Sequence, residues 1–292
     1  MQALNKFNHN TNVIGIIGHP IKHSFSPLMH NIAFELQDLK YIYLPFDVPA
    51  ANLKDALKGM TALGIKGFNV TLPLKEKITQ HLHVVSEEAS VIGAVNTVVN
   101  DNGRLHGYNT DVHGIIETLN KYKDEITDST VTVLGSGGAA RSTIYALIRN
   151  FKAGRINIVN RTLQKAESMK EYFSAKMHYD TIKTYQLVPP DVVNILRDSK
   201  LIINTTSSGM SPEIDDAPTT NEASFGEGQI VFDLIYNPID TKFLKVAKSC
   251  GATTLNGLTM FVEQGAQAFE LWTGEKMPKE KIYKALKSYL SV

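Results

Sequence analysis

A strand, a glycine-rich turn and a helix follow one another near the middle of the chain. The strand is the β-branched run Thr130–Leu134, and a helix is expected over Ser142–Asn150. Gly135 permits a tight turn between them and Gly137 lets the main chain approach a phosphate, while the small Ala140 allows close packing of helix on strand. The helix N-terminus supplies unpaired N–H groups to an anion. This order predicts a site for the pyrophosphate of a dinucleotide.

Composition narrows the class of protein. The 292 residues are enough for about two domains, and a net charge of +1 argues against a broad nucleic-acid interface. The single cysteine, Cys250, excludes an intramolecular disulfide and suits a reducing compartment; we expect it to be a small buried residue. Met1–Asn12 is polar, unlike a signal peptide, and no apolar run approaches the ~18 residues of a membrane span. We therefore expect a cytoplasmic protein, monomer or homodimer, with no membrane or nucleic-acid partner.

The second half of the chain alternates short apolar runs with helix-compatible stretches. The runs are Val131–Leu134, Ile156–Val159, Leu201–Ile203 and Ile230–Ile235. This alternation predicts a parallel sheet of Rossmann type with right-handed crossovers. The first 110 or so residues show a similar but less regular alternation. The sequence thus predicts an α/β protein of two domains: a dinucleotide-binding domain over 113–257, and a discontinuous substrate domain over 1–112 to which helices within 258–292 return.

The second strand of the Rossmann-type domain indicates which dinucleotide is bound. In NAD-binding domains this strand ends in an acid that binds the ribose hydroxyls. Here Ile156–Val159 is followed by Asn160-Arg161-Thr162, with Lys165 one helical turn further on, and no acid is present. Two cations and a hydroxyl suit an additional 2′-phosphate. NADP is favoured, although a solvated basic helix start would give the same residues.

Four polar segments in the first domain follow or flank short apolar strands. They are Gly18–Asn31, Asn69–Lys75, Gly93–Thr97 and Gly107–Asp111. Ligands of open α/β sheets collect at the carboxyl ends of strands, and hydroxyl and amide side chains suit a small polyhydroxylated acid. Within these segments Lys75 and Asp111 form the titratable pair. Ser24 and Ser26 could equally cap a helix that starts at Pro27.

Histidines in the first polar segment invite a metal hypothesis. His19, His23 and His30 are interrupted by prolines, so they share no single helical face, and no acid joins them at ligand spacing. We expect no metal site.

These segments, in this order ahead of Gly135–Arg141 and Asn160–Thr162, resemble the shikimate dehydrogenase family. The resemblance continues nearly to the end of the chain, through Asn204–Met210, Asp233–Pro238 and Asn256–Gly265. It implies oxidation of the 3-hydroxyl of shikimate to 3-dehydroshikimate with hydride passing to NADP+. The physiological direction it implies is the reverse, a step of aromatic amino-acid biosynthesis.

The resemblance also implies residue roles. Ser24 and Ser26 would bind the substrate carboxylate; Thr71, Asn96 and Gln264 would hold ring hydroxyls, with Asn69 and Tyr236 lining the pocket. Lys75 matches the catalytic lysine of the family and Asp111 its partner. The cofactor positions would be Gly135, Ser136, Gly137, Gly138, Ala139, Asn160, Arg161, Thr162, Lys165, Thr205, Leu234 and Gly257.

Two other functions remain as alternatives. A relative that uses quinate as well as shikimate, with NAD or with both cofactors, would share these motifs. A non-catalytic dinucleotide sensor would keep the fold but has no need of both Lys75 and Asp111. A third function, that of a folate dehydrogenase, is disfavoured. Its substrate would need an aromatic slot, whereas the predicted pocket is built of Ser, Thr, Asn and Gln.

Overall fold

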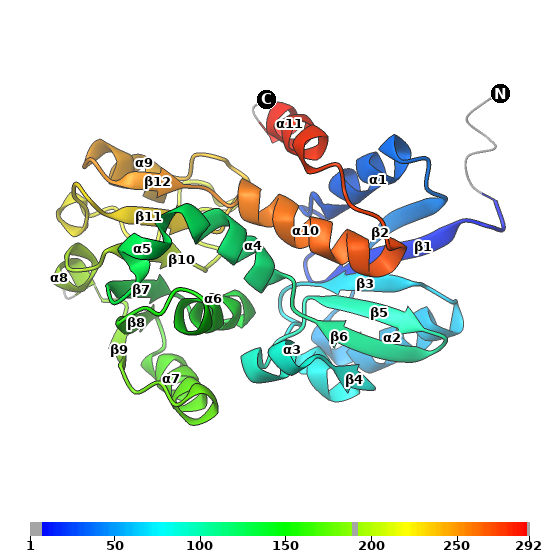
Figure 1. Ribbon diagram of the computed structural model, residues 1–292, viewed down its shortest axis with the longest axis horizontal. Helices are drawn as coiled ribbons and strands as arrows, with labels where there is room; N and C mark the ends of the chain where they lie inside the picture. The colour runs from blue at the N-terminus through cyan, green and yellow to red at the C-terminus, as the bar shows by residue number, and fades with distance from the viewer. Residues whose placement is uncertain (1–7, 189–191, 291–292) are drawn as a thin grey trace. The chain divides into compact units, whose positions relative to one another are not determined.

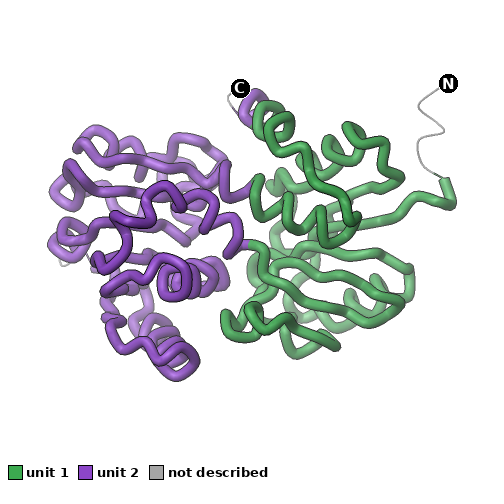
Figure 2. Tube along the Cα trace, viewed as in Figure 1, with its two compact units in different colours: residues 1–110, 262–286 green, residues 111–261, 287–292 purple. Residues whose placement is uncertain are grey.

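The computed structural model describes residues 8–188 and 192–290. The chain forms two compact units, shown in different colours in Figure 2. Unit 1 comprises the chain up to Thr110 together with Val262–Leu286, and unit 2 comprises Asp111–Phe261 with the last residues. No helix in the described part of the chain has the length and apolar character needed to cross a membrane.

Unit 1 is built on a mixed six-stranded sheet of order β2-β1-β3-β5-β6-β4 (Figure 1). Its strands are β1 (Asn12–Gly18), β2 (Tyr41–Asp47), β3 (Gly67–Val70), β4 (Val84–Val85), β5 (Thr97–Asp101) and β6 (Arg104–Tyr108). Strand β5 runs antiparallel to both neighbours, and the other pairs are parallel. The helices are α1 (Ser26–Leu36), α2 (Leu53–Ala62), α3 (Glu87–Ile92), most of α10 (Leu258–Thr273) and most of α11 (Lys279–Leu290).

The two faces of this sheet bury different kinds of side chain. One face packs on α2 through an apolar cluster that includes Leu57, Met60, Phe68 and Val98. The other holds an aromatic cluster of α1, β2 and α10, made of His30, Phe34, Tyr43, Phe269 and Trp272. Successive strand residues point to opposite faces, so Asn69, next to Phe68, lies on the face of the aromatic cluster.

Unit 2 contains a six-stranded sheet of order β12-β11-β10-β7-β8-β9 in which every pair is parallel. Its strands are β7 (Thr130–Leu134), β8 (Arg155–Asn160), β9 (Ile182–Gln186), β10 (Leu201–Asn204), β11 (Ile230–Asp233) and β12 (Thr253–Leu255). The helices that begin in it are α4 (Asp111–Leu119), α5 (Lys123–Ile126), α6 (Gly138–Arg149), α7 (Leu163–Met177), α8 (Val192–Arg197), α9 (Lys242–Ser249) and α10. Helices α8 and α9 pack on one face through a core that includes Leu196, Ile202, Val231 and Phe243.

The predicted parallel sheet of unit 2 is confirmed, since its four central strands coincide with the four apolar runs. Three details differ from expectation. Helix α6 begins at Gly138, not at Ser142, because the turn needs only three residues. The antiparallel β5 and β6 were not expected, although the Asp101-Asn-Gly103 turn between them is a hairpin signal. Cys250 is only half-buried, because it caps the C-terminus of α9.

Two glycines of unit 1 should respond in opposite ways to alanine. A Cβ on Gly67 would lie 2.3 Å from Trp272 Nε1 and 2.6 Å from the Val98 carbonyl oxygen, the two atoms of a 3.0 Å hydrogen bond. Gly59 is an exposed residue inside α2 with open space around it. We expect Gly67→Ala to lower the free energy of unfolding by about 1–3 kcal/mol, and Gly59→Ala to raise it by about 0.5–1 kcal/mol. Urea unfolding measures both, and equal shifts would contradict this packing.

Candidate functional site

The glycine turn after β7 has the shape that a phosphate needs. Gly135 has φ +111°, and a Cβ there would lie 2.6 Å from Thr205 Oγ1, so only glycine fits. Its N–H donates to the Val159 carbonyl oxygen at 2.9 Å, which fixes the turn between β7 and β8. Gly137 is the N-cap of α6, and a Cβ placed on it would meet nothing within 4 Å. The turn therefore leaves open space directly at the N-terminus of a twelve-residue helix.

The ends of β10 and β11 lie at the same edge of the sheet as this turn. Thr205 donates from both its N–H and its hydroxyl to the carbonyl oxygen of Leu134, at 2.9 and 2.7 Å. Leu234, which follows β11, donates its N–H to the Asn204 carbonyl oxygen at 3.0 Å. A Cβ on Gly257 would lie 2.0 Å from the Leu234 carbonyl oxygen, so the main chains must touch there. The predicted cofactor residues of these loops thus lie around the glycine turn.

The end of β8 carries two exposed cations. Arg161 and Lys165 are exposed, and neither makes an ion pair within the described residues. Asn160 Nδ2 donates to the Thr162 carbonyl oxygen at 2.9 Å and shapes the turn into α7. No acid follows β8 before α7 begins. The residues present therefore suit a dinucleotide with a phosphate on its ribose.

Asp233 joins the loops after β10 and β11. Its carboxylate accepts hydrogen bonds from Asn204 Nδ2 at 3.0 Å, the Ile235 N–H at 3.1 Å and the Thr241 hydroxyl at 2.7 Å. The side chain is fully buried, and burial raises its pKa from 3.8 to about 7, although the three hydrogen bonds act in the opposite direction. Asp233 therefore positions these loops from the protein interior and is not itself exposed to a ligand.

In unit 1 the predicted substrate residues form a buried hydrogen-bond network. Asn69 Nδ2 donates to the Asn96 carbonyl oxygen at 3.1 Å and to Thr97 Oγ1 at 3.0 Å. Asn96 Oδ1 accepts from the Thr110 N–H at 2.7 Å and from the Thr97 hydroxyl at 3.1 Å. Asn96 Nδ2 faces Thr110 Oγ1 at 2.9 Å and, more weakly, Gln264 Oε1 at 3.5 Å. The structure thus brings Asn69, Asn96 and Gln264 together.

Lys75 is tied to the same network through its main chain. Its carbonyl oxygen accepts the N–H of Val95, the neighbour of Asn96, at 2.8 Å. Thr71 begins the loop that carries Lys75, and its N–H donates to the Ile17 carbonyl oxygen at 2.9 Å. Lys75 and Thr71 are both half-buried, as a ligand-binding side chain at a strand end should be.

The serines lie where α1 begins. Ser26 is buried as the first helical residue, and the N-cap position is Phe25, so neither serine occupies the N-cap. Ser24 Oγ instead accepts the Ser26 N–H at 3.3 Å. The alternative expectation of an N-cap serine is therefore not met.

Two of the predicted catalytic and substrate residues, Asp111 and Tyr236, belong to unit 2. Asp111 is the buried first residue of α4 and directly follows Thr110 in the chain. Tyr236 is half-buried and stacks on Phe261 with ring centroids 4.1 Å apart. The grouping of these two with the residues of unit 1 stays a prediction.

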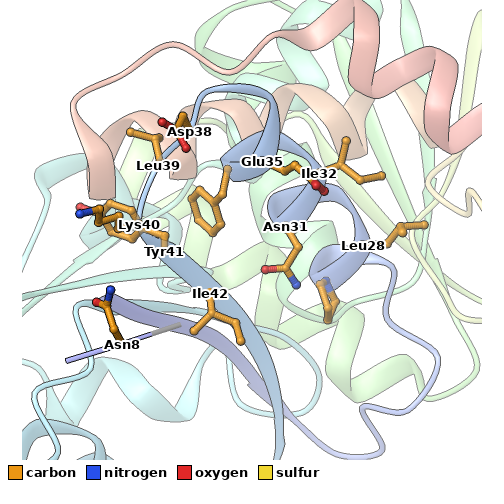
Figure 3. A pocket seen from close by; sticks show the side chains of 12 residues that line it. Asn8, Leu28, Asn31, Ile32, Glu35, Asp38, Leu39, Lys40, Tyr41 and Ile42 are labelled. Carbon is orange, nitrogen blue, oxygen red and sulfur yellow. The ribbon is translucent and has the colours of Figure 1, made fainter. Parts of the chain in front are cut away.

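An open pocket of about 1000 Å³ in unit 1 lies elsewhere (Figure 3). It is lined by α1, β2 and the segment between them, including Asn31, Glu35 and Lys40. None of the predicted site residues lines it. In the parts of the chain that the structure describes, no group of three or more His, Cys, Asp or Glu side chains could hold a metal.

Sequence reasoning missed several residues of these networks. Tyr43, Thr97 and Thr110 hydrogen-bond directly to Asn69 or Asn96, and Asp233 stands in a motif for which the sequence predicts no role of its own. Thr97 and Thr110 fall within the quoted polar segments, so their hydroxyls were visible signals. Tyr43 stands in an apolar strand, where nothing separates it from an ordinary core residue.

Known proteins resemble this chain over nearly its whole length. Family models match residues 16–98 (shikimate dehydrogenase substrate binding domain), 117–238 (shikimate / quinate 5-dehydrogenase) and 257–287 (shikimate 5'-dehydrogenase C-terminal domain). The shikimate dehydrogenase (NADP(+)) of Caldanaerobacter subterraneus subsp. tengcongensis is 45% identical over 286 residues, 97% of this chain and 99% of that one.

Solved structures agree. A shikimate dehydrogenase in complex with NADP+ superposes with a TM-score of 0.89 at 41% identity, covering 97% of each chain. A shikimate 5-dehydrogenase of Listeria monocytogenes, in complex with shikimate and NAD, has a TM-score of 0.83 at 36% identity and covers 96% of this chain and 98% of that one.

The burial of Asp233 predicts how the free energy of unfolding depends on pH. Between its unfolded pKa of 3.8 and its folded pKa of about 7, the folded chain binds a proton that the unfolded chain does not. The contribution of this group to the free energy of unfolding therefore falls as the pH rises across that window, by at most roughly 1.4 kcal/mol per pH unit. Asp233→Asn removes the titration. We expect the stability of wild type relative to the variant to fall from pH 4 to pH 7 in urea unfolding; a difference that stays constant would refute the assignment.

Proposed function

The chain belongs to the shikimate dehydrogenase family, and on this premise we propose that its two units divide the reaction between substrate and cofactor. The activity is the reversible, NADP-dependent reduction of 3-dehydroshikimate to shikimate, a step in aromatic amino-acid biosynthesis. Unit 1 would bind the substrate and unit 2 the NADP. We further place the reaction in the cytoplasm, which suits a chain with one cysteine.

The observation that carries the assignment for unit 1 is the amide and hydroxyl network around Asn96. Asn96 and Gln264 present side-chain amides from different elements, and Thr71 adds a hydroxyl. These groups would bind the ring hydroxyls, with Asn69 behind them. Ser24 and Ser26 would bind the carboxylate, and Tyr236 would line the pocket.

Lys75 and Asp111 would handle the proton. When the carbonyl is reduced, its oxygen gains negative charge and must take up a proton. The Lys75 ammonium, at hydrogen-bond distance from that oxygen, would stabilise the charge and donate the proton. Asp111 would accept a hydrogen bond from the ammonium and hold it in place. Oxidation of shikimate uses the same groups in reverse.

NADP supplies the hydride acceptor or donor, and the chain supplies placement and charge. The N–H groups at the start of α6, with Gly135, Ser136, Gly137, Gly138 and Ala139, would hold the pyrophosphate. Arg161 and Lys165, with Asn160 and Thr162, would hold the 2′-phosphate. Thr205, Leu234 and Gly257 would line the remainder of the cofactor site.

Lys75→Ala tests the proposed chemistry. Loss of a positioned acid–base group should lower kcat by about 10²–10⁴-fold, measured as absorbance at 340 nm with shikimate and NADP, the direction in which Lys75 would accept the proton. Binding of NADP, measured by fluorescence titration, should be unchanged. Lys77→Ala, an exposed lysine two residues further on, is the matched control and should keep full activity. If Lys75→Ala kept more than about a tenth of the wild-type kcat, the loss would be smaller than the usual acid–base effect. Lys75 would then not be the group that transfers the proton.

Arg161→Ala tests the choice of cofactor. A hydrogen bond to a charged group is worth ~1.5–3 kcal/mol, or roughly 10- to 150-fold in affinity. The KM for NADP should rise within this range, while the KM for NAD should stay nearly constant. Lys176→Ala, an exposed lysine in the last turn of α7, controls for loss of charge. Equal losses with both cofactors would contradict the 2′-phosphate role.

Repeating the assay of the wild-type protein with quinate decides whether the substrate is shikimate alone or shikimate and quinate.

A further inference from the structure

His30 and Asn31 are two polar residues of the first segment to which the proposed function gives no role. They lie on α1, one turn after Ser26. His30 is fully buried with both ring nitrogens unpartnered, and burial lowers its pKa to about 3, so the ring is neutral. A buried polar ring without hydrogen bonds lowers the stability of the fold. The aromatic contacts of the ring must therefore offset that loss.

The contact of His30 is with Tyr43. The two rings stack with centroids 4.5 Å apart and planes 11° from parallel. Asn31 holds the main chain of the same residue, because its Nδ2 donates to the Tyr43 carbonyl oxygen at 3.0 Å and its Oδ1 accepts the Tyr43 N–H at 2.9 Å. Strand β2 is the edge of the sheet, so Asn31 supplies the pair of hydrogen bonds that a further strand would supply. Figure 3 shows Asn31 on α1, directed toward β2.

Tyr43 in turn binds the amide oxygen of Asn69 and holds that side chain in place. The Tyr43 hydroxyl donates to Asn69 Oδ1 at 2.7 Å. The direction is set by chemistry, because Asn69 contacts the Asn96 carbonyl oxygen on its other side, and a carbonyl can only accept. The nitrogen of Asn69 must face Asn96, its oxygen must face Tyr43, and the tyrosine must be the donor.

The consequence reaches the proposed substrate amides. With its Nδ2 so directed, Asn69 also donates to Thr97 Oγ1 at 3.0 Å, which leaves the Thr97 hydrogen for Asn96 Oδ1 at 3.1 Å. Asn96 Oδ1 thus accepts the Thr97 hydroxyl as well as the Thr110 N–H, and Asn96 Nδ2 faces Thr110 Oγ1 and Gln264 Oε1.

The aromatic cluster also borders the helix that carries Gln264. Phe269 and Trp272 of α10 pack against the His30 ring, with centroids 6.3 and 5.3 Å away. Gly265, next to Gln264, lies so close to α1 that a Cβ there would be 2.1 Å from Met29 Cε. The same stretch of α1 therefore contacts both Tyr43 and the α10 turn that presents Gln264.

We propose that His30, Asn31 and Tyr43 form a positioning relay that holds the Asn69 side chain in place beside Asn96 and thereby raises the affinity for the ring hydroxyls of the substrate. The relay rests on the proposed function of Asn96 and Gln264. Its members touch neither substrate nor cofactor; they act through Asn69. The relay gives a role to the stacking of His30 on the Tyr43 ring and to the hydrogen bonds of Asn31 with the Tyr43 main chain.

Tyr43→Phe is the direct test, because it keeps the stacked ring and removes only the hydroxyl that reaches Asn69. The loss of one net hydrogen bond predicts a rise of about 3- to 10-fold in the KM for shikimate, with the KM for NADP unchanged and kcat within about 2-fold of wild type. Tyr41→Phe is the matched control. Tyr41 lies on the same strand and stacks on Phe34, and its hydroxyl makes no hydrogen bond within the described residues. The KM values of this variant should equal those of wild type.

A double-mutant cycle separates the relay from general loosening. If Tyr43 acts through Asn69, Tyr43→Phe should have no further effect on the shikimate KM in an Asn69→Ala background. His30→Phe keeps a stacked ring and should bind shikimate like wild type, whereas His30→Ala should raise the KM as Tyr43→Phe does. Should either alanine variant fail to fold, Tyr43→Phe alone decides.

The outcomes are distinct. An unchanged shikimate KM in Tyr43→Phe, or an equal rise in the KM for both shikimate and NADP, overturns the relay while wild type remains active. A wild-type protein that does not reduce NADP with shikimate overturns the proposed function itself.

Discussion

Hydrogen bonding of buried polar side chains at the ends of strands is the constraint on which both units depend. A buried donor or acceptor without a partner costs about 1–3 kcal/mol, so each such group restricts its neighbours. In unit 1 Asn69 and Asn96 satisfy one another and three hydroxyl-bearing residues. In unit 2 the side chains of Asn204 and Asp233 hydrogen-bond to each other and to main-chain N–H groups of the loops after β10 and β11. Loops that would otherwise be free to move are thereby given one arrangement each.

The sequence predicts best what depends on local pattern. Strands β7, β8, β10 and β11 are buried on both faces, so they appear as nearly continuous apolar runs. The turn at Gly135 is equally local, since its positive φ and the crowding by Thr205 require glycine whatever the rest of the chain does. Edge strands such as β9 are polar and half-exposed, and no alternation distinguishes them from a loop.

The residues of the candidate site likewise fall into those that local pattern predicts and those that it does not. Lys75, Asn96 and the serines could be named because they stand in polar segments beside apolar strands. The partners that orient them could not, because Tyr43 reaches Asn69 across 26 residues and Asn96 meets Gln264 across 168. Only the fold brings such pairs together. The spacing of His30 and Asn31 likewise says that both lie on α1, but not that one contacts the ring and the other the main chain of Tyr43.

An amide of fixed direction is what a hydroxyl-rich substrate requires. A free asparagine can turn its nitrogen or its oxygen toward a ligand, and it then discriminates little between a donor and an acceptor. Asn96 has lost that freedom, because its oxygen is occupied by the Thr110 N–H and the Thr97 hydroxyl. A site built to hydrogen-bond a hydroxyl rejects an analogue without it by about 10⁴–10⁵-fold, since the polar groups of the site are then left unpaired. Selectivity for ring hydroxyls therefore depends as much on the buried residues that orient Asn96 as on Asn96 itself.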